Sequence, residues 1–127
     1  MIIGLGIDLV SIERVRKYLN NDCLKNGFIH YTFTNKEIEA ANQKKDPAEY
    51  LATRFAVKEA FFKAASHIGN DINIDIRKTE CLNHENGSPY ITEQSISYIT
   101  EQYHISAIHV SISTEDDYAL AEVIIEG

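Results

Sequence analysis

Two kinds of hydrophobic pattern run along this chain, a two-residue alternation near both ends and helical spacing through much of the middle. The alternation predicts three half-buried strands, over residues 2–9, 106–113 and 118–125. A further alternation of isoleucines with polar residues predicts a strand over 72–82, before a turn at 85–89.

Apolar spacing and capping residues predict four short helices, over residues 12–20, 22–31, 35–42 and 93–103. Ser11 and Thr92 are the candidate N-caps of the first and last of them. Thr34 with Glu37 matches a capping box at the start of the third. The signal for 22–31 is weak.

The clearest helix start has Asp46 as N-cap, Pro47 at the first helical position and Glu49 at the third. Because Ala, Leu, Phe and Lys dominate the residues after Glu49, this helix should continue to about residue 66. The chain contains no repeat, linker or low-complexity stretch. We therefore expect an α+β fold, a single compact domain over 1–127 with an antiparallel sheet packed on the long central helix.

The composition narrows the possible partners. A length of 127 residues with 44% hydrophobic and 24% charged residues fits one globular domain with a real core. There is no basic leader and no apolar run of membrane-spanning length, so we expect a cytoplasmic protein without a membrane partner. The net charge of -7 opposes broad nucleic-acid binding. Cys23 and Cys81 lie far apart, which favours two reduced thiols.

Asp8 is the first candidate for chemistry, because it lies in the apolar segment IIGLGIDLV. Burying an unpaired carboxylate is costly, so something should compensate it. In one interpretation Asp8 caps the next helix or reaches water at the strand end. In the other, Asp8 and Glu59 hold a divalent cation. Mg²⁺ suits such a pair, since it takes one or two carboxylates and completes its shell with water and phosphates.

The central helix contains RFAVKEAFFK, in which three cations surround one acid. Arg54 and Lys58 share one face of the helix, and Glu59 and Lys63 share a neighbouring face. Cations beside paired carboxylates point to phosphate chemistry. The same spacing also fits an ordinary solvated face with a surface Glu59–Lys63 pair. Spacing alone leaves both interpretations open.

Two phosphate-binding motifs are excluded. Gly4 and Gly6 form GxG, but the third glycine of a dinucleotide fingerprint is replaced by Leu9, and the chain has no GK[ST]. The five histidines show no metal-ligand spacing. In IHVSIS, His109 and Ser111 share a polar strand face, which fits a binding surface or simple solvent exposure.

The order of these segments resembles the holo-acyl-carrier-protein synthases, the short 4'-phosphopantetheinyl transferases. The resemblance covers almost the whole chain, and the strand aspartate and the RFAxKEAxxKA helix are its most specific parts. The matching segments are GLGIDLVSIERVRK, TNKE, RFAVKEAFFKA, NGSPYI, HVSIS and DYALAEVIIE.

The resemblance implies transfer of 4'-phosphopantetheine from coenzyme A to a serine of an apo acyl carrier protein, with Mg²⁺ as cofactor and release of adenosine 3',5'-bisphosphate. Asp8 and Glu59 match the metal ligands. Glu59 would take the serine proton, directly or through a metal-bound water, and Lys63 would stabilise phosphate charge. The positions that match coenzyme A contacts are Arg54, Lys58, Lys63, Gly87, Pro89, His109 and Ser111.

The resemblance also implies a homotrimer with active sites between neighbouring protomers. Arg14 matches a carrier-binding position on the first helix. A protomer at -7 would repel an acidic carrier at long range, so docking should depend on a local basic cluster. We expect Arg14 and Lys17 to contact the carrier, with Arg16 and Lys25 beside them.

Three departures from the family pattern stand out. The helix ends in KAASHIG instead of KAxGxG, the GKP turn reads GSP, and Thr114 replaces the second histidine of HVSxxH. One alternative is therefore a non-catalytic α+β module that binds an acidic partner protein. A two-carboxylate nuclease or phosphatase is a further alternative, although such sites usually gather three or more acids.

Overall fold

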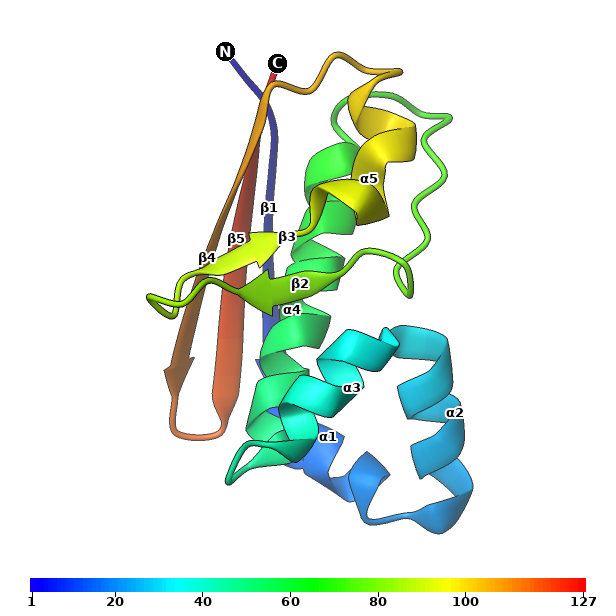
Figure 1. Ribbon diagram of the computed structural model, residues 1–127, viewed down its shortest axis with the longest axis vertical. Coiled ribbons are helices and arrows are strands. Elements are labelled where there is room, and N and C mark those ends of the chain that lie inside the picture. Colours follow the sequence, from blue (N-terminus) through cyan, green and yellow to red (C-terminus); the bar gives the residue numbers. More distant parts are fainter.

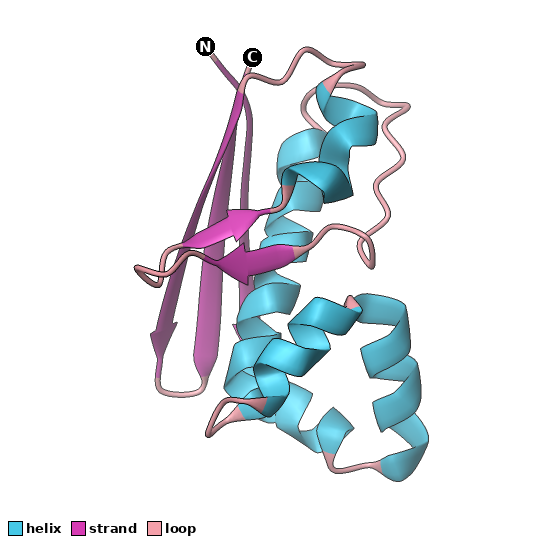
Figure 2. Ribbon diagram, viewed as in Figure 1, coloured by secondary structure: helices cyan, strands magenta, loops and turns pink.

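A long helix, α4 (Pro47–Ala65), packs along one face of a three-stranded antiparallel sheet (Figures 1 and 2). The computed structural model describes residues 1–127. The sheet has the order β1-β5-β4, with β1 (Ile2–Ser11) and β4 (Ala107–Glu115) on either side of β5 (Tyr118–Glu126). The predicted α+β fold with a sheet on a central helix is confirmed.

Three short helices gather at the end of the molecule where α4 begins (Figure 1). They are α1 (Ile12–Leu19), α2 (Asp22–Thr32) and α3 (Asn35–Asn42). Near the other end of α4 lies α5 (Glu93–Thr100). A two-stranded hairpin, β2 (Cys81–Asn83) and β3 (Pro89–Ile91), precedes α5. No helix combines the length and the apolar character needed to cross a membrane.

The predicted caps fix where the helices begin. The Ser11 side chain accepts a hydrogen bond from the Arg14 N–H, and the Asp46 side chain caps α4 through the Glu49 N–H. The Thr34 capping box is present in full. Thr92 occupies the N-cap position of α5 without a side-chain bond. Local sequence therefore set these four helix starts correctly.

The predicted strand over 72–82 is wrong, because only Cys81–Asn83 is a strand. A turn precedes it, closed by the Thr79 N–H donating to the Asp75 carbonyl. The carbonyl of Thr79 in turn accepts a hydrogen bond from the ammonium of Lys58 on α4. The backbone around residues 75–79 thus bonds within its own turn and to a lysine instead of to a partner strand.

Small residues allow β1 and α4 to approach closely. A Cβ on Gly6 would collide with the backbone oxygen of Ala60, and one on Gly4 would collide with that of Ala64. On the helix side the contact is made by a buried row of alanines at four-residue spacing, Ala52, Ala56, Ala60 and Ala64. The glycines of GLGIDL therefore serve strand–helix packing.

We predict that Gly6→Ala lowers the free energy of unfolding by about 1–3 kcal/mol, because the added methyl meets backbone that cannot move aside cheaply. The matched control is Gly27→Ala, since Gly27 lies inside α2 with open space around it. That variant should be neutral or more stable by up to ~1 kcal/mol. Urea denaturation measures both. Equal effects of the two substitutions would contradict the close-contact account.

Candidate active site

Asp8 points from β1 toward α4, on the same strand face as Gly4 and Gly6. Its side chain is only 16% exposed. The ammonium of Lys63 lies 3.0 Å from the Asp8 carboxylate and donates a second hydrogen bond to the Ile7 carbonyl. A residue 55 positions away thus compensates the charge of Asp8, and the interpretation of Asp8 as a helix cap is wrong, because Ser11 takes that role.

Glu59 completes this cluster from the preceding turn of α4. Four residues separate it from Lys63, so the two side chains share a helix face. Burial raises the pKa of Glu59, the negative charge of Asp8 raises it further, and Lys63 opposes both effects. Because Lys63 bonds to Asp8 and shares a helix face with Glu59, the three residues form one cluster.

This donor set fits a hard divalent cation. Two carboxylates that repel each other would both be stabilised by a cation between them. No group of three or more acidic, histidine or cysteine side chains in the chain is arranged to hold a metal. A bound cation would therefore keep most of its shell for water and substrate oxygens, which is the usual pattern for Mg²⁺.

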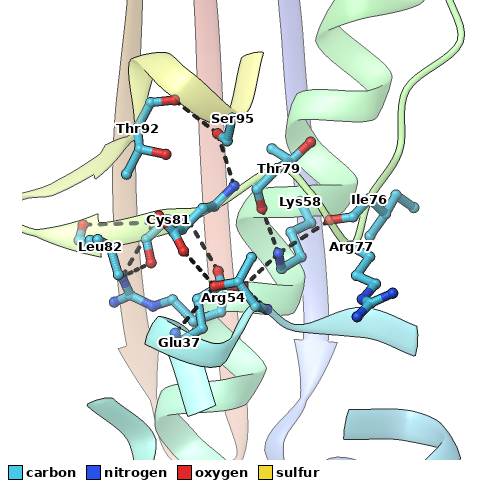
Figure 3. A network of polar contacts seen from close by, with 12 residues as sticks. Glu37, Arg54, Lys58, Ile76, Arg77, Thr79, Cys81, Leu82, Thr92 and Ser95 are labelled. Carbon is cyan, nitrogen blue, oxygen red and sulfur yellow. Dashed lines mark hydrogen bonds and ion pairs between the residues drawn. The ribbon is translucent and has the colours of Figure 1, made fainter. Parts of the chain in front are cut away.

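Lys58 does not belong to this site, and its assignment to coenzyme A is corrected. Its side chain is 0% exposed and lies 2.7 Å from the equally buried carboxylate of Glu37 (Figure 3). Its other donors go to the carbonyls of Ile76 and Thr79. Burial lowers the pKa of Lys58, and Glu37 opposes that effect. With three donors engaged inside the protein, Lys58 has none left for a phosphate.

The sequence predicts only one role for Glu37, as part of the capping box of α3, and not its ion pair with Lys58. Its carboxylate accepts hydrogen bonds from the N–H of Thr34, as the capping box predicts, and from the N–H of Cys81, 44 residues away. Together with Lys58 it joins α3, α4 and β2 (Figure 3). Nothing in the local spacing signals this second role, since it depends on a segment distant in sequence.

We predict that Lys58→Met destabilises the protein by about 3–5 kcal/mol, because it leaves the Glu37 carboxylate buried without a counter-ion. The double variant Glu37→Gln/Lys58→Met should lose clearly less. Lys36→Met, at an exposed position on α3, is the control and should stay within ~0.5 kcal/mol of the parent. Denaturant unfolding checks all three, and a double variant as damaged as the single one would refute the ion-pair explanation.

Arg54 also faces away from Asp8. It is 3% exposed, stacks at 4.3 Å on the Tyr50 ring and donates to the backbone oxygen and the sulfur of Cys81. Burial raises the pKa of that thiol to about 11. The predicted stripe of cations is therefore divided between two regions of α4, and Glu59 with Lys63 forms a separate site.

Arg54 still borders a surface hollow of about 440 Å³ between α4 and the tip of β4. Two lysines missed in the sequence analysis line it, Lys44 and Lys45, together with Thr114. The signal that could have found them is the pair of cations directly before the Asp46 N-cap, which places them beside the start of a helix. The hollow is a candidate phosphate-binding surface.

His109 and Ser111 lie on the other face of the sheet. Ser111 and Ile7 are both paired with Glu122, so their side chains share the face opposite to Asp8. His109 is exposed there and contacts the Glu126 carboxylate at 2.8 Å. Within one chain these two residues therefore do not meet the Asp8–Glu59–Lys63 cluster.

The remaining predicted positions are exposed or lie at turns. Gly87 has a φ of +90°, which suits the turn of the β2–β3 hairpin, and Pro89 begins β3. Arg14 and Lys17 are exposed on α1 and form no ion pair. Arg16 is engaged with Asp46 through two hydrogen bonds of 2.7 and 3.0 Å. It therefore contributes less to a free basic cluster than the sequence suggested.

Comparison with known proteins identifies the family. The model of the 4'-phosphopantetheinyl transferase superfamily matches residues 4–123. The chain belongs to this superfamily. A holo-[acyl-carrier-protein] synthase from Wolbachia sp. subsp. Drosophila simulans (strain wRi) is 39% identical over 98% of this chain and 98% of its own length.

Solved structures agree with this assignment. The crystal structure of the holo-[acyl-carrier-protein] synthase from Neisseria meningitidis superposes with a TM-score of 0.84 at 32% identity, covering 100% of both chains. The Helicobacter pylori enzyme, solved in complex with coenzyme A, gives a TM-score of 0.76 at 27% identity, covering 96% of this chain and 99% of its own. The Asp8–Glu59–Lys63 cluster therefore lies in a fold shared with proteins named holo-[acyl-carrier-protein] synthase, one of them solved with coenzyme A bound.

Proposed function

We propose that this protein transfers 4'-phosphopantetheine from coenzyme A to a serine of an apo acyl carrier protein and releases adenosine 3',5'-bisphosphate. The observation that carries the proposal is the convergence of Asp8, Glu59 and Lys63, which brings two carboxylates and one mobile cation to one place. Family membership and relatives named holo-[acyl-carrier-protein] synthase support it.

Asp8 and Glu59 are the residues that would hold Mg²⁺. When bound, this ion would neutralise charge on the pyrophosphate of coenzyme A. Lys63 is half exposed, so its ammonium is able to leave Asp8 and donate to a phosphate oxygen. It would stabilise the charge that develops on the phosphate and on the leaving group.

Glu59 is the candidate base of the reaction. The serine oxygen forms a bond to the β-phosphorus while the bond from that phosphorus to the bridging oxygen of the pyrophosphate breaks. The serine proton then goes to Glu59, directly or through a water. Glu59 is the candidate because Asp8 is already paired with Lys63, whereas Glu59 forms no ion pair.

The outer face of the sheet supports a homotrimer with sites between protomers. Leu5, Ile7 and Leu9 on β1 are each more than half exposed, which is an unusual apolar row for a free surface. The same face carries His109 and Ser111 on β4. Since one chain holds these two residues opposite to Asp8, a neighbouring protomer would have to supply them to a coenzyme A bound at the cluster.

Mixing two inactive variants tests the shared site. Asp8→Asn removes a metal ligand that one protomer supplies to the shared site, and His109→Ala removes the group that the neighbouring protomer supplies. Each variant alone should therefore transfer poorly. Unfolding and refolding them as a one-to-one mixture should restore activity at about a quarter of the sites, those that combine two intact halves. A mixture no more active than its parts would place the whole site within one chain.

The transfer itself is tested by mass spectrometry of an apo carrier incubated with the protein, coenzyme A and Mg²⁺. We predict a phosphopantetheine mass shift whose rate falls by about 100-fold or more in Glu59→Gln and Lys63→Met. Glu93→Gln, at an exposed position on α5, should leave the rate unchanged. If no carrier gains mass with the parent protein, the non-catalytic binding module becomes the better explanation.

Carrier docking should depend on the exposed cations Arg14 and Lys17 of α1. The protein as a whole is acidic, so only a local patch attracts an acidic carrier, and salt should weaken that attraction. Arg14→Glu should raise the KM for the carrier by about tenfold or more at low salt and leave the KM for coenzyme A unchanged. An unaltered carrier KM would remove α1 from the docking surface.

A further inference from the structure

A second hollow, of about 280 Å³, lies at the N-terminal end of α4. No residue of the Asp8–Glu59–Lys63 cluster lines it. Residues of α1, α2, α3 and the start of α4 line it. These elements lie together at one end of the molecule (Figure 1). Half of its lining is apolar, formed by Leu19, Ile29, Ile38, Ala41, Ala48 and Leu51. The other half consists of Pro47 and five polar or charged residues at the rim. The apolar half forgoes dispersion contacts unless something packs against it.

The helix beside the hollow, α2, is attached to the core through Phe28, which packs against the rings of Tyr18, Phe33 and Phe55, but its other contacts are sparse. Each of the other four helices buries at least two residues, whereas α2 buries none. Leu24 and Tyr31 of α2 are 48% and 81% exposed, and Ile29 faces the hollow. A bound molecule would give Ile29 a packing partner and fix α2 against the rest of the protein.

The rim of the hollow favours an anion. Arg16 and Asp46 lie there, but they neutralise each other through two hydrogen bonds. Asn20 and Asn42 are uncharged. Lys25 forms no hydrogen bond or ion pair, so it is the free charge at this rim in a chain of net charge -7. A negatively charged head group would therefore bind beside Lys25.

The apolar part of this hollow faces away from the proposed docking residues of α1. At 100° per residue, Leu19 lies well over a third of a turn around the helix from both Arg14 and Lys17. Only Arg16 and Lys25 at the rim belong to the basic cluster expected beside the carrier, so the apolar interior is left for a small molecule. The volume has room for about nine groups of ~30 Å³, the size of a water molecule or a methylene.

We propose that this hollow binds a medium-chain carboxylate. The apolar tail of about nine carbons packs among Leu19, Ile38 and Leu51, and the carboxylate lies at Lys25. The site is independent of the transferase proposal, because no residue of the Asp8–Glu59–Lys63 cluster lines it.

Amide hydrogen exchange of α2 tests the proposal with decanoate as the probe. Saturating decanoate should slow exchange in α2 by about fivefold or more, because the helix is now packed on both sides. Decyltrimethylammonium has the same tail and the opposite charge, and it should protect α2 far less. Lys25→Gln should weaken decanoate binding severalfold, whereas Lys36→Gln, a surface lysine outside the hollow, should not change it.

A variant that fills the hollow provides a second test of the proposal. Ala41 is 2% exposed and lines the hollow, so the longer side chain in Ala41→Leu should occupy the space and abolish decanoate protection. Equal protection by the two head groups, equal binding by Lys25→Gln and the parent, or no protection of α2 at all would each overturn the proposal. The Lys25 comparison decides it even if Ala41→Leu does not fold. Transferase activity is measured separately and does not enter this result.

Discussion

The close contact between β1 and α4 is the constraint on which the candidate site depends. Gly4 and Gly6 have no side chains to separate the strand from the helix, so the backbone of β1 packs directly against the alanine row of α4. Asp8 is the next residue on this strand face, so it is the first side chain to meet the helix. It meets the turn that carries Glu59 and Lys63, and packing therefore produces the convergence of charge.

The charged residues of α4 serve two different purposes. Lys58 and Arg54 are buried. Lys58 uses its donors on Glu37 of α3 and on the turn before β2, and Arg54 joins α4 to β2 through Cys81. Glu59 and Lys63 are partly exposed. Partial burial and the negative charge of Asp8 raise the pKa of Glu59, and Lys63 offsets these effects only in part. A buried network with every donor used rigidifies the helix, whereas a group with unmet charge is available for a ligand. One helix thus provides both the scaffold and the reactive groups.

Much of the fold could be predicted from local signals, because caps and two-residue alternation act over a few residues. The caps Ser11, Thr34 and Asp46 and the outer strands are where they were predicted. The prediction of a strand over 72–82 was wrong because part of this segment forms a turn, and its carbonyls accept hydrogen bonds from the Lys58 side chain instead of from a neighbouring strand. For α4, which is buried on most sides, spacing shows which residues share a face but not which face reaches solvent. The pairing of Asp8 with Glu59 was one of two interpretations that the residues left open, and only the family resemblance favoured it, since nothing local joins residues so far apart.

The central claim is that Asp8 and Glu59 share one divalent cation. Crystals soaked with Mn²⁺ and coenzyme A, and measured at a wavelength where manganese scatters anomalously, test it directly. The account predicts a single anomalous peak in coordination contact with both carboxylates, with Lys63 displaced from Asp8. A peak bound by only one of them, or a cation elsewhere on the protein, would contradict it.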